Sequence, residues 1–327
     1  MAIELFELDL PQEISAAFER GKRCTFGIET VCPHCGKGPR DWKLRAGILT
    51  SGPRAGKPWW GCMRCHCETR YAAERHTAKL KIGFDAEKAK ADAKRLRLSA
   101  MRTWECTSTI RPGDPVDRYL REQRMLTPVA GAWPVDIRYA QIEYHHGDGR
   151  RPRRYDAMVA AVRTPAGDFM GIHRTYLMPD GQRADGKDLP DDVRVHEAKK
   201  AMGPILSGSV HLYSDCEPTK LGIAEGIETS VAFQMYLDLP CVSTISAAGM
   251  EAVQIPKSVR YAFIGPDIGD VGRGEHDKHK GLKAAVFLRE RLLADAETAG
   301  RPLTVTLCPP PISGRADWND WAIAARK

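Results

Sequence analysis

Two Cys-x-x-Cys pairs constrain the fold of this chain more than any other feature. Cys32 and Cys35 form "CPHC", Cys62 and Cys65 form "CMRC", and 26 residues separate the pairs. Each pair presents two thiolates on a tight turn, and four thiolates suit the tetrahedral coordination of Zn²⁺. The sequence therefore predicts a zinc-binding module whose intervening segment forms a hairpin.

The surrounding residues leave the exact ligand set open. Six of the ten cysteines fall within residues 24–67, and Cys67, His34 and His66 lie close enough to replace one of the four ligands. The first 15 residues are acidic and lack the basic and apolar regions of a signal peptide, which predicts a cytoplasmic protein. Clustered cysteines in such a chain are more often metal ligands than disulfides.

The tryptophans beside the cysteines have two explanations. Trp59 and Trp60 lie near Lys57 and Arg64, and aromatic rings interleaved with cations suit stacking on single-stranded bases and contact with phosphates. The alternative is that tryptophans build the small core of the module, which we expect for Trp42 and for one of the pair.

Alternating patterns predict a mixed α/β chain, α+β overall, with several parts. A length of 327 residues allows about two or three domains. In the last third, predicted strands alternate with helices, which favours a parallel sheet covered by helices. The predicted segments are an N-terminal helix over 1–21, a zinc-ribbon module over 22–76, a basic helical linker over 77–104, a mixed α/β middle block over 105–210 and an α/β block over 211–327.

Charge is distributed unevenly along the chain. Residues 1–110 carry 20 Lys and Arg against 13 Asp and Glu, whereas residues 205–327 carry 13 against 15. A basic front suits binding to a polyanion, although an uneven solvated surface is an equally good explanation. No apolar run is long enough to span a membrane.

Acidic residues follow two predicted strands of the last block. Glu225 comes directly after the strand 221–224, and Asp267 and Asp270 follow the strand 261–264. Ligands of parallel α/β sheets bind at the carboxyl ends of the strands, so these carboxylates converge if the strands are neighbours. Converging carboxylates suit Mg²⁺ or Mn²⁺.

Helix capping is the competing explanation for these acids. Asp317, Asn319 and Asp320 open the last predicted helix, where Asp and Asn are common caps. The same alternative applies less well to Glu225, because Gly226 leaves room for close approach of a ligand. "SGPRAGKPWW" is not a phosphate-binding loop, since its glycine spacing is one residue short and Pro58 stands where Ser or Thr belongs.

Several motifs together resemble DnaG-like primases. "IAEGIETS", "STISAAGM", "FIGPDIGD" and "GLKAAVFL" resemble a Toprim domain, and "DWND" resembles its closing acidic motif. In the middle block, "RYLREQRMLTP", "YDAMVAAVRTPAGDFMGIHRTYL" and "HEAKKAMGP" resemble the catalytic core of bacterial-type primases. With a zinc ribbon in front, the order is similar to that of Toprim primases of phages and mobile elements.

The resemblance implies an enzyme that makes primers on single-stranded DNA from nucleoside triphosphates, with structural Zn²⁺ and catalytic Mg²⁺ or Mn²⁺. A separate replicative helicase is the expected partner. The residues it implicates are the catalytic acids Glu225, Asp267 and Asp270, the further metal-binding acids Glu228, Asp317 and Asp320, and the nucleotide- or template-binding residues His173, Arg174, Lys199 and Lys200.

The chain departs from the family pattern at one motif. The family usually has Asp-x-Asp where this chain has Asp267-x-x-Asp270, and the insertion "VGRGEHDKHK" follows. Asp267 and Asp270 are therefore both candidates for the aspartate that is out of register with the family motif. Asp277, in the insertion, is a remote substitute. A Toprim nuclease and a non-catalytic zinc-ribbon protein that binds nucleic acid are the alternatives, and a topoisomerase fits less well because no domain with a strand-breaking tyrosine is recognisable.

Overall fold

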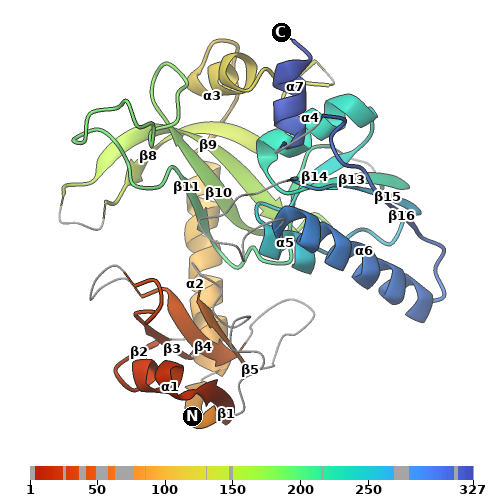
Figure 1. The fold of residues 1–327 in the computed structure, drawn as a ribbon. Coiled ribbons are helices and arrows are strands. Elements are labelled where there is room, and N and C mark those ends of the chain that lie inside the picture. The colour runs from red at the N-terminus through yellow and green to blue at the C-terminus, as the bar shows by residue number, and fades with distance from the viewer. Residues whose placement is uncertain are drawn as a thin grey trace. The chain divides into compact units, whose positions relative to one another are not determined.

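The computed structural model is a mixed α/β structure (Figure 1). It describes residues 4–24, 27–36, 42–48, 58–62, 77–84, 86–129, 131–146, 150–214, 217–268, 280–312 and 316–326. The chain forms two compact units, one from the described residues up to Arg95 and one from those beginning at Leu96. None of the helices in these ranges has the length and apolar character needed to cross a membrane.

A four-stranded antiparallel sheet forms the centre of the amino-terminal unit. Across the sheet the strands are β2 (Lys22–Cys24), β3 (Gly27–Thr30), β4 (Leu44–Ile48) and β5 (Pro58–Cys62). Ile14 and Phe18 lie one turn apart on helix α1 (Gln12–Glu19) and share a buried core with Leu44. The hairpin predicted between the cysteine pairs is confirmed as β4 and β5.

The prediction of a helix over residues 1–21 is wrong in its first half. β1 (Glu4–Pro11) is a strand, antiparallel to β6 (Thr77–Phe84), and the register places Glu7 opposite Lys81. β1 alternates apolar and acidic residues from position 6 to position 10, which is the period of a strand and not of a helix.

The same pairing corrects the predicted helical linker over residues 77–104. Its first eight residues are β6, and the helix α2 (Ala86–Glu105) begins only after them. From position 78 to position 82, β6 alternates small or apolar residues with lysines, which is the period of a strand.

The second unit begins with an antiparallel sheet of five strands. The order is β11-β10-β9-β8-β7, and its bounds are β7 (Ser108–Thr109), β8 (Ile137–Tyr144), β9 (Arg153–Arg163), β10 (Phe169–Leu177) and β11 (Lys199–Met202). The short helix α3 (Pro115–Arg118) continues into a π-helical turn, η2 (Tyr119–Gln123). The two long strands predicted around the turn at residues 164–168 are confirmed as β9 and β10.

A second five-stranded sheet has the order β12-β14-β13-β15-β16. Its strands are β12 (Val210–His211), β13 (Lys220–Ala224), β14 (Cys241–Ser243), β15 (Tyr261–Gly265) and β16 (Thr304–Leu307). β12 is antiparallel to β14, and the other four strands are parallel. The helices are α4 (Ile227–Leu237), α5 (Ala247–Ala252), α6 (Lys280–Thr298) and α7 (Trp318–Ala324).

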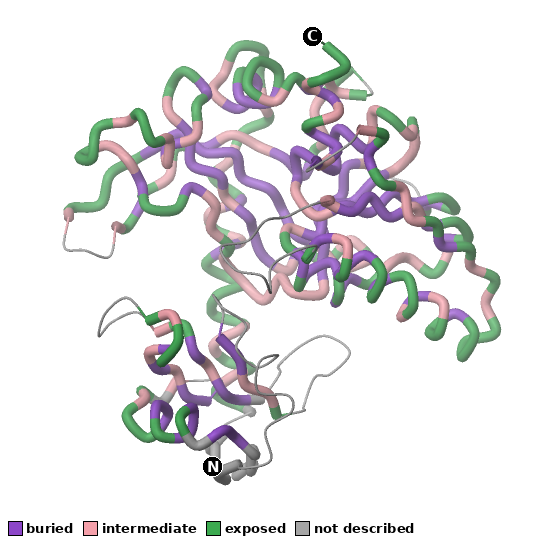
Figure 2. The backbone as a smooth tube through the Cα atoms, viewed as in Figure 1, coloured by how far each residue is buried: buried purple, intermediate pink, exposed green. Residues whose placement is uncertain are grey.

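The two sheets of this unit share one core. Residues of α4 and α7, among them Phe233 and Trp318, are buried in the same cluster as Met158 and Leu177 of the antiparallel sheet. The other face of the parallel sheet packs on α5 and α6. Figure 2 shows the buried backbone running along the central strands of both sheets. This shared core fixes α4 and α7 relative to the antiparallel sheet.

Candidate functional site

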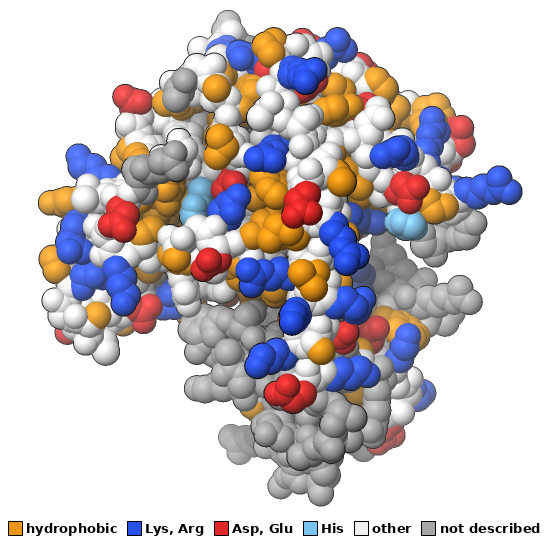
Figure 3. All heavy atoms as spheres, turned by 180° about the vertical axis from the view of Figure 1, so that it is seen from behind, with side chains coloured by type: hydrophobic (Ala, Val, Ile, Leu, Met, Phe, Trp, Pro, Cys, Tyr) orange, Lys and Arg blue, Asp and Glu red, His pale blue; other side chains and the backbone are white. Residues whose placement is uncertain are grey.

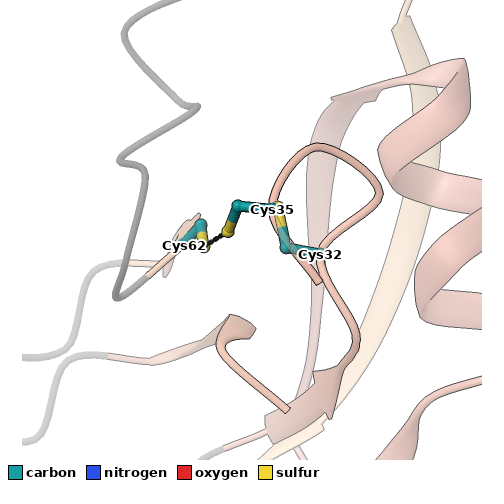
Figure 4. Close-up of side chains that lie close together, drawn as sticks. All are labelled: Cys32, Cys35 and Cys62. Carbon is teal, nitrogen blue, oxygen red and sulfur yellow. Dashed lines mark hydrogen bonds between the residues drawn. The ribbon is translucent and has the colours of Figure 1, made fainter. Parts of the chain in front are cut away.

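Three cysteines of the amino-terminal unit form a compact sulfur cluster. Cys32 and Cys35 lie on the turn after β3, Cys62 ends β5, and their sulfurs lie within 4.8 Å of one another (Figure 4). The Cys35 and Cys62 sulfurs are 3.5 Å apart. Zn–S bonds of about 2.3 Å place sulfurs about 3.8 Å apart in a tetrahedron, so the cluster fits zinc.

The other residues predicted for this module divide into two groups. Trp60 on β5 packs against the core of the unit, so for this tryptophan the core explanation is confirmed. Trp59, its neighbour, is half-buried. His34, one of the possible substitute ligands, is exposed and does not belong to the compact sulfur cluster. The fourth predicted ligand, its other two possible substitutes and two of the predicted cations lie outside the described residues: Cys65, His66, Cys67, Lys57 and Arg64.

In the second unit, two predicted acids follow adjacent parallel strands. β13 and β15 pair so that Ala224 lies beside Gly265, with Glu225 directly after the first strand and Asp267 two residues after the end of the second. The Glu225 Oε2 and Asp267 Oδ1 atoms are both buried. The condition for their convergence, that the two strands are neighbours, is met, and the convergence itself stays a prediction. Asp270 lies outside the described residues.

Glu225 does not cap the helix that follows it. Gly226 is the N-cap residue of α4, and no side chain caps this helix. Glu225 is therefore not the N-cap residue of this helix.

Asp317 and Asp320, in contrast, form a capping box on α7. Asp317 Oδ1 accepts from the Asp320 backbone N–H at 2.8 Å, and Asp320 Oδ2 accepts from the Asp317 backbone N–H at 3.0 Å. A bridge between Ile268 and Ala316 brings Asp317 to the same edge as Asp267. Burial, with a further contribution from the charge of Asp320, raises the pKa of Asp317. Capping explains both residues, and a role in metal binding stays a prediction.

Within the parts of the chain that the structure describes, no acidic group is as tight as the cysteine cluster. No three His, Cys, Asp or Glu ligand atoms other than those sulfurs lie within 4.8 Å of one another. The described carboxylates of this edge therefore do not form a group as compact as the three sulfurs.

Glu228 is buried and has partners on both oxygens. The Tyr119 hydroxyl donates to Oε1 at 2.5 Å, and the Lys199 ammonium lies 3.0 Å from Oε2. Burial alone would raise its pKa, but the charges of Lys199 and Arg124 hold the pKa of Glu228 well below its usual range. Glu228 is therefore ionised and joins α4 to two segments of the antiparallel-sheet half.

Arginines that the sequence analysis did not implicate surround this pair. Arg124 Nε donates to the Tyr119 hydroxyl at 3.1 Å, and Arg183 pairs with Asp185 at 2.6 Å. Arg183 is close enough to Arg124 for its charge to act on the pKa of Arg124. The site thus has an acidic side and a basic side.

A π-helical turn is the signal that could have identified Arg124. Its backbone N–H bonds the carbonyl of Tyr119, five residues earlier, so its side chain lies over the Tyr119 ring. π-helical turns are frequent at functional sites.

The pleat of the antiparallel sheet separates the four predicted basic residues. Arg174 lies opposite Lys200 in the register, and the next pair is Thr175 with Lys199. Because side chains alternate between faces, Lys199 and His173 lie on one face and Arg174 and Lys200 on the other. These four residues are therefore not one cluster.

The two faces have different surroundings. Lys200 Nζ lies 3.8 Å from the centre of the Tyr144 ring, and Arg174 donates to the Tyr176 hydroxyl. His173 is buried on the face of Lys199, and burial, assisted by the charge of Lys199, lowers its pKa to about 4. His173 is thus neutral at pH 7 and adds no positive charge to the site.

Basic side chains are dispersed on the surface seen in Figure 3. Lys and Arg are interspersed there with acidic and apolar side chains. On this face the charge distribution alone does not mark a path for a polyanion.

Comparison with known proteins gives a consistent set of similarities. A family model described as a domain of unknown function (DUF7146) matches residues 94–212, less than half of the chain, and no curated protein matches. The chain is similar to a DnaG primase catalytic domain bound to ssDNA, with 16% identity over 72% of this chain and 78% of that chain and a TM-score of 0.41.

Two further solved structures are also primases. The zinc-binding and RNA polymerase domains of Aquifex aeolicus primase share 13% identity over 97% of this chain and 84% of that chain, with a TM-score of 0.41. The primase fragment of the bacteriophage T7 primase-helicase protein shares 12% over 90% and 93%, with a TM-score of 0.35. Likenesses of this size do not by themselves assign an activity.

Proposed function

We propose that the chain is a zinc-ribbon Toprim primase that synthesises short primers on single-stranded DNA. The carrying observation is that Glu225 and Asp267 follow adjacent parallel strands, while Glu228, in the first turn of the next helix, pairs with Lys199 of β11. Carboxylates beside a cation suit the binding of a nucleoside triphosphate together with its divalent metal.

The donor set fits a hard divalent cation. Glu225 and Asp267 each bury a carboxylate oxygen at the edge of the sheet, and oxygen is the ligand that Mg²⁺ and Mn²⁺ prefer. We expect Glu225, Asp267 and Asp270 to hold the ion, with Asp317 and Asp320 nearby. When bound, the ion stabilises negative charge on the reacting phosphates.

The basic side of the site supplies charge for the triphosphate. Lys199, Arg124 and Arg183 lie on the antiparallel-sheet half and can contact phosphate oxygens. In the proposed reaction, the 3′-hydroxyl of one nucleotide attacks the α-phosphorus of the next. A new P–O bond forms and the hydroxyl proton passes to solvent, while the α-phosphorus bond to the bridging oxygen breaks and pyrophosphate leaves with the electron pair.

The zinc module would hold the template. Cys32, Cys35 and Cys62, with Cys65, would bind one structural zinc, and Trp59 is a candidate to stack on a base. We place this activity in the cytoplasm, in the replication of a phage or mobile element, with a separate helicase.

One assay tests the proposal against its alternatives. The full chain is incubated with single-stranded DNA, nucleoside triphosphates and Mg²⁺ or Mn²⁺, and products are sized on a gel. New short oligonucleotides support a primase. Shortened template would indicate a metal-dependent nuclease, and unchanged template with no product would indicate a binding protein.

A further inference from the structure

Glu228 combines burial with two strong partners from distant segments. The residue is buried, and Tyr119 and Lys199 each use one of its carboxylate oxygens. A carboxylate bound in this way has little left for a metal, whereas Glu225, three residues earlier, has no capping role. The two acids of "AEGIET" therefore have different surroundings.

Lys199 is positioned differently from its partner. Its side chain is 37% exposed, and that of Glu228 is 6% exposed. The ammonium contacts the buried carboxylate, and part of the Lys199 side chain is accessible to a ligand. An ammonium has three donors, so one bond to Glu228 leaves donors for phosphate oxygens.

The charges around the pair leave a cationic excess. Lys199, Arg124 and Arg183 are cations, Glu228 and Asp185 are their anionic partners, and the buried His173 is neutral. An anionic ligand at this place would balance the remaining charge.

A second contact joins the same helix turn to the acidic edge. Thr229, the residue after Glu228, donates its hydroxyl to Asp317 Oδ2 at 3.3 Å. Asn319 donates its side-chain amide to the Arg124 carbonyl at 2.7 Å. The first turn of α4 thus contacts the acidic edge through Thr229 and the basic side through Glu228.

We propose that Glu228 is a positioning residue that holds Lys199 for the triphosphate of the incoming nucleotide, and that it is not a metal ligand. This inference rests on the proposed function, because it assigns a role within the same site. It predicts that metal binding and nucleotide binding respond differently when Glu228 is changed.

Glu228→Gln tests this directly. The amide has one acceptor oxygen for two donors, Tyr119 and Lys199, so at least one bond is lost. Loss of a negative charge would by itself strengthen binding of a triphosphate. We nevertheless expect nucleoside triphosphate affinity to fall about tenfold, as for one charge-assisted hydrogen bond.

The measurements use the full chain without turnover. Mn²⁺ binding is followed by electron paramagnetic resonance, and triphosphate binding by calorimetry in the presence of Mg²⁺. Mn²⁺ affinity should stay within about twofold in Glu228→Gln and fall at least about tenfold in Glu225→Gln. Glu290→Gln, an exposed acid on α6, is the matched control and should change neither affinity.

Lys199→Met and the double variant complete the cycle. Both should lose triphosphate affinity to the same extent as Glu228→Gln, since one interaction is removed in each case. Thermal unfolding of all variants separates this from loss of fold, and Lys199→Arg, which keeps the charge pair, serves if Lys199→Met does not fold.

The outcomes separate this inference from the proposed function. Tenfold loss of Mn²⁺ affinity in Glu228→Gln would make Glu228 a metal ligand and overturn the inference. Unchanged triphosphate affinity in a folded Glu228→Gln would also overturn it, while leaving the primase proposal standing. A wild-type chain that binds no triphosphate would remove both.

Discussion

At Glu225 the backbone leaves β13 and enters α4 through Gly226, which is the helix cap and needs no side chain from its neighbour. Asp317 opens α7 with a full capping box. Glu225 and Asp317 both lie near the start of a helix, but only Asp317 is the N-cap residue. The sequence alone left capping open for both, because the identity of the N-cap residue depends on where the helix begins.

We expect Glu225→Gln to abolish nucleotidyl transfer while leaving fold and template binding intact. The swap is nearly isosteric and removes the charge that attracts a divalent cation, and loss of such a group costs on the order of 10²–10³ in rate. Primer synthesis on a gel measures it, with Asp267→Asn in parallel. Glu251→Gln, exposed on α5, is the control. Near wild-type synthesis by Glu225→Gln would remove Glu225 from the active site.

His173 makes a prediction for stability against pH. Its pKa is about 4 in the folded chain against an ordinary 6.5, because it is buried and lies near Lys199. Between these values the unfolded chain binds more protons, so stability is fully present above pH 6.5 and is lost as the pH falls towards 4.

Urea unfolding at several pH values measures this effect. His173→Asn should reduce the loss of unfolding free energy between pH 6.5 and 4, by at most about 1.4 kcal/mol per pH unit. His211, whose pKa is also lowered by burial, leaves a residual slope. His145→Asn, at an exposed position, should keep the wild-type slope; an unaltered slope in His173→Asn would contradict the assignment.

At the scale of elements, local patterns predicted the strands and helices of the last block well. The strands predicted over 221–224 and 261–264 are β13 and β15, each within one residue, because short apolar runs alternate there with helical segments. β1 was missed because its alternating pattern is short and runs directly into α1. The order of the strands was not predicted. The sequence predicted only that Glu225 and Asp267 converge if their two strands are neighbours.

Contacts between distant segments were beyond sequence reasoning. Tyr119 and Glu228 are 109 residues apart, and only the packing of the two sheets on a shared core makes them neighbours. The separation of Arg174 from Lys199 follows from the pairing register of β10 and β11, which a one-residue slip would reverse. Cysteine spacing, in contrast, predicted the three-sulfur cluster directly.

The two Cys-x-x-Cys pairs predict one zinc per chain. Cys62 ends β5 and contacts Cys35 from the turn after β3, so a metal would tie the edge strand β5 to this turn. Metal analysis of the purified chain should give about one equivalent of zinc. Cys62→Ala should lower this content and the stability of the amino-terminal unit. Cys106→Ala, at an exposed position, is the control, and zinc near zero in an untreated wild-type preparation would refute the site.

At the scale of the whole molecule, charge is divided between the two parts of the chain. The first 110 residues hold a net positive charge equal to that of the entire protein, and the last 123 are slightly acidic. Metal-binding acids and template-binding cations would compete if they were mixed, since acids repel phosphates. Their separation along the sequence suits a chain that binds a polyanion with one part and carries out metal-dependent chemistry with another.

We therefore expect template affinity to reside mainly in residues 22–104. Each cation that contacts a phosphate of single-stranded DNA adds about 0.7 to the slope of log affinity against log salt. Changing Lys90, Lys94 and Arg97, which are exposed on α2, to alanine should weaken binding and flatten this slope by up to about 2 units. Alanine keeps the helix, because it is the strongest helix former.

The matched control changes three exposed cations of the last block, Lys257, Lys283 and Arg289, to alanine. The overall charge falls equally in the two triple variants, so a difference between them reports where the template binds and not how charged the protein is. Fluorescence anisotropy with labelled single-stranded DNA at several salt concentrations gives both slopes. A larger loss of slope in the control than in the α2 variant would move the template site to the acidic half of the chain. Equal losses would indicate that the template contacts both halves, because counterions are released only where cations meet phosphates.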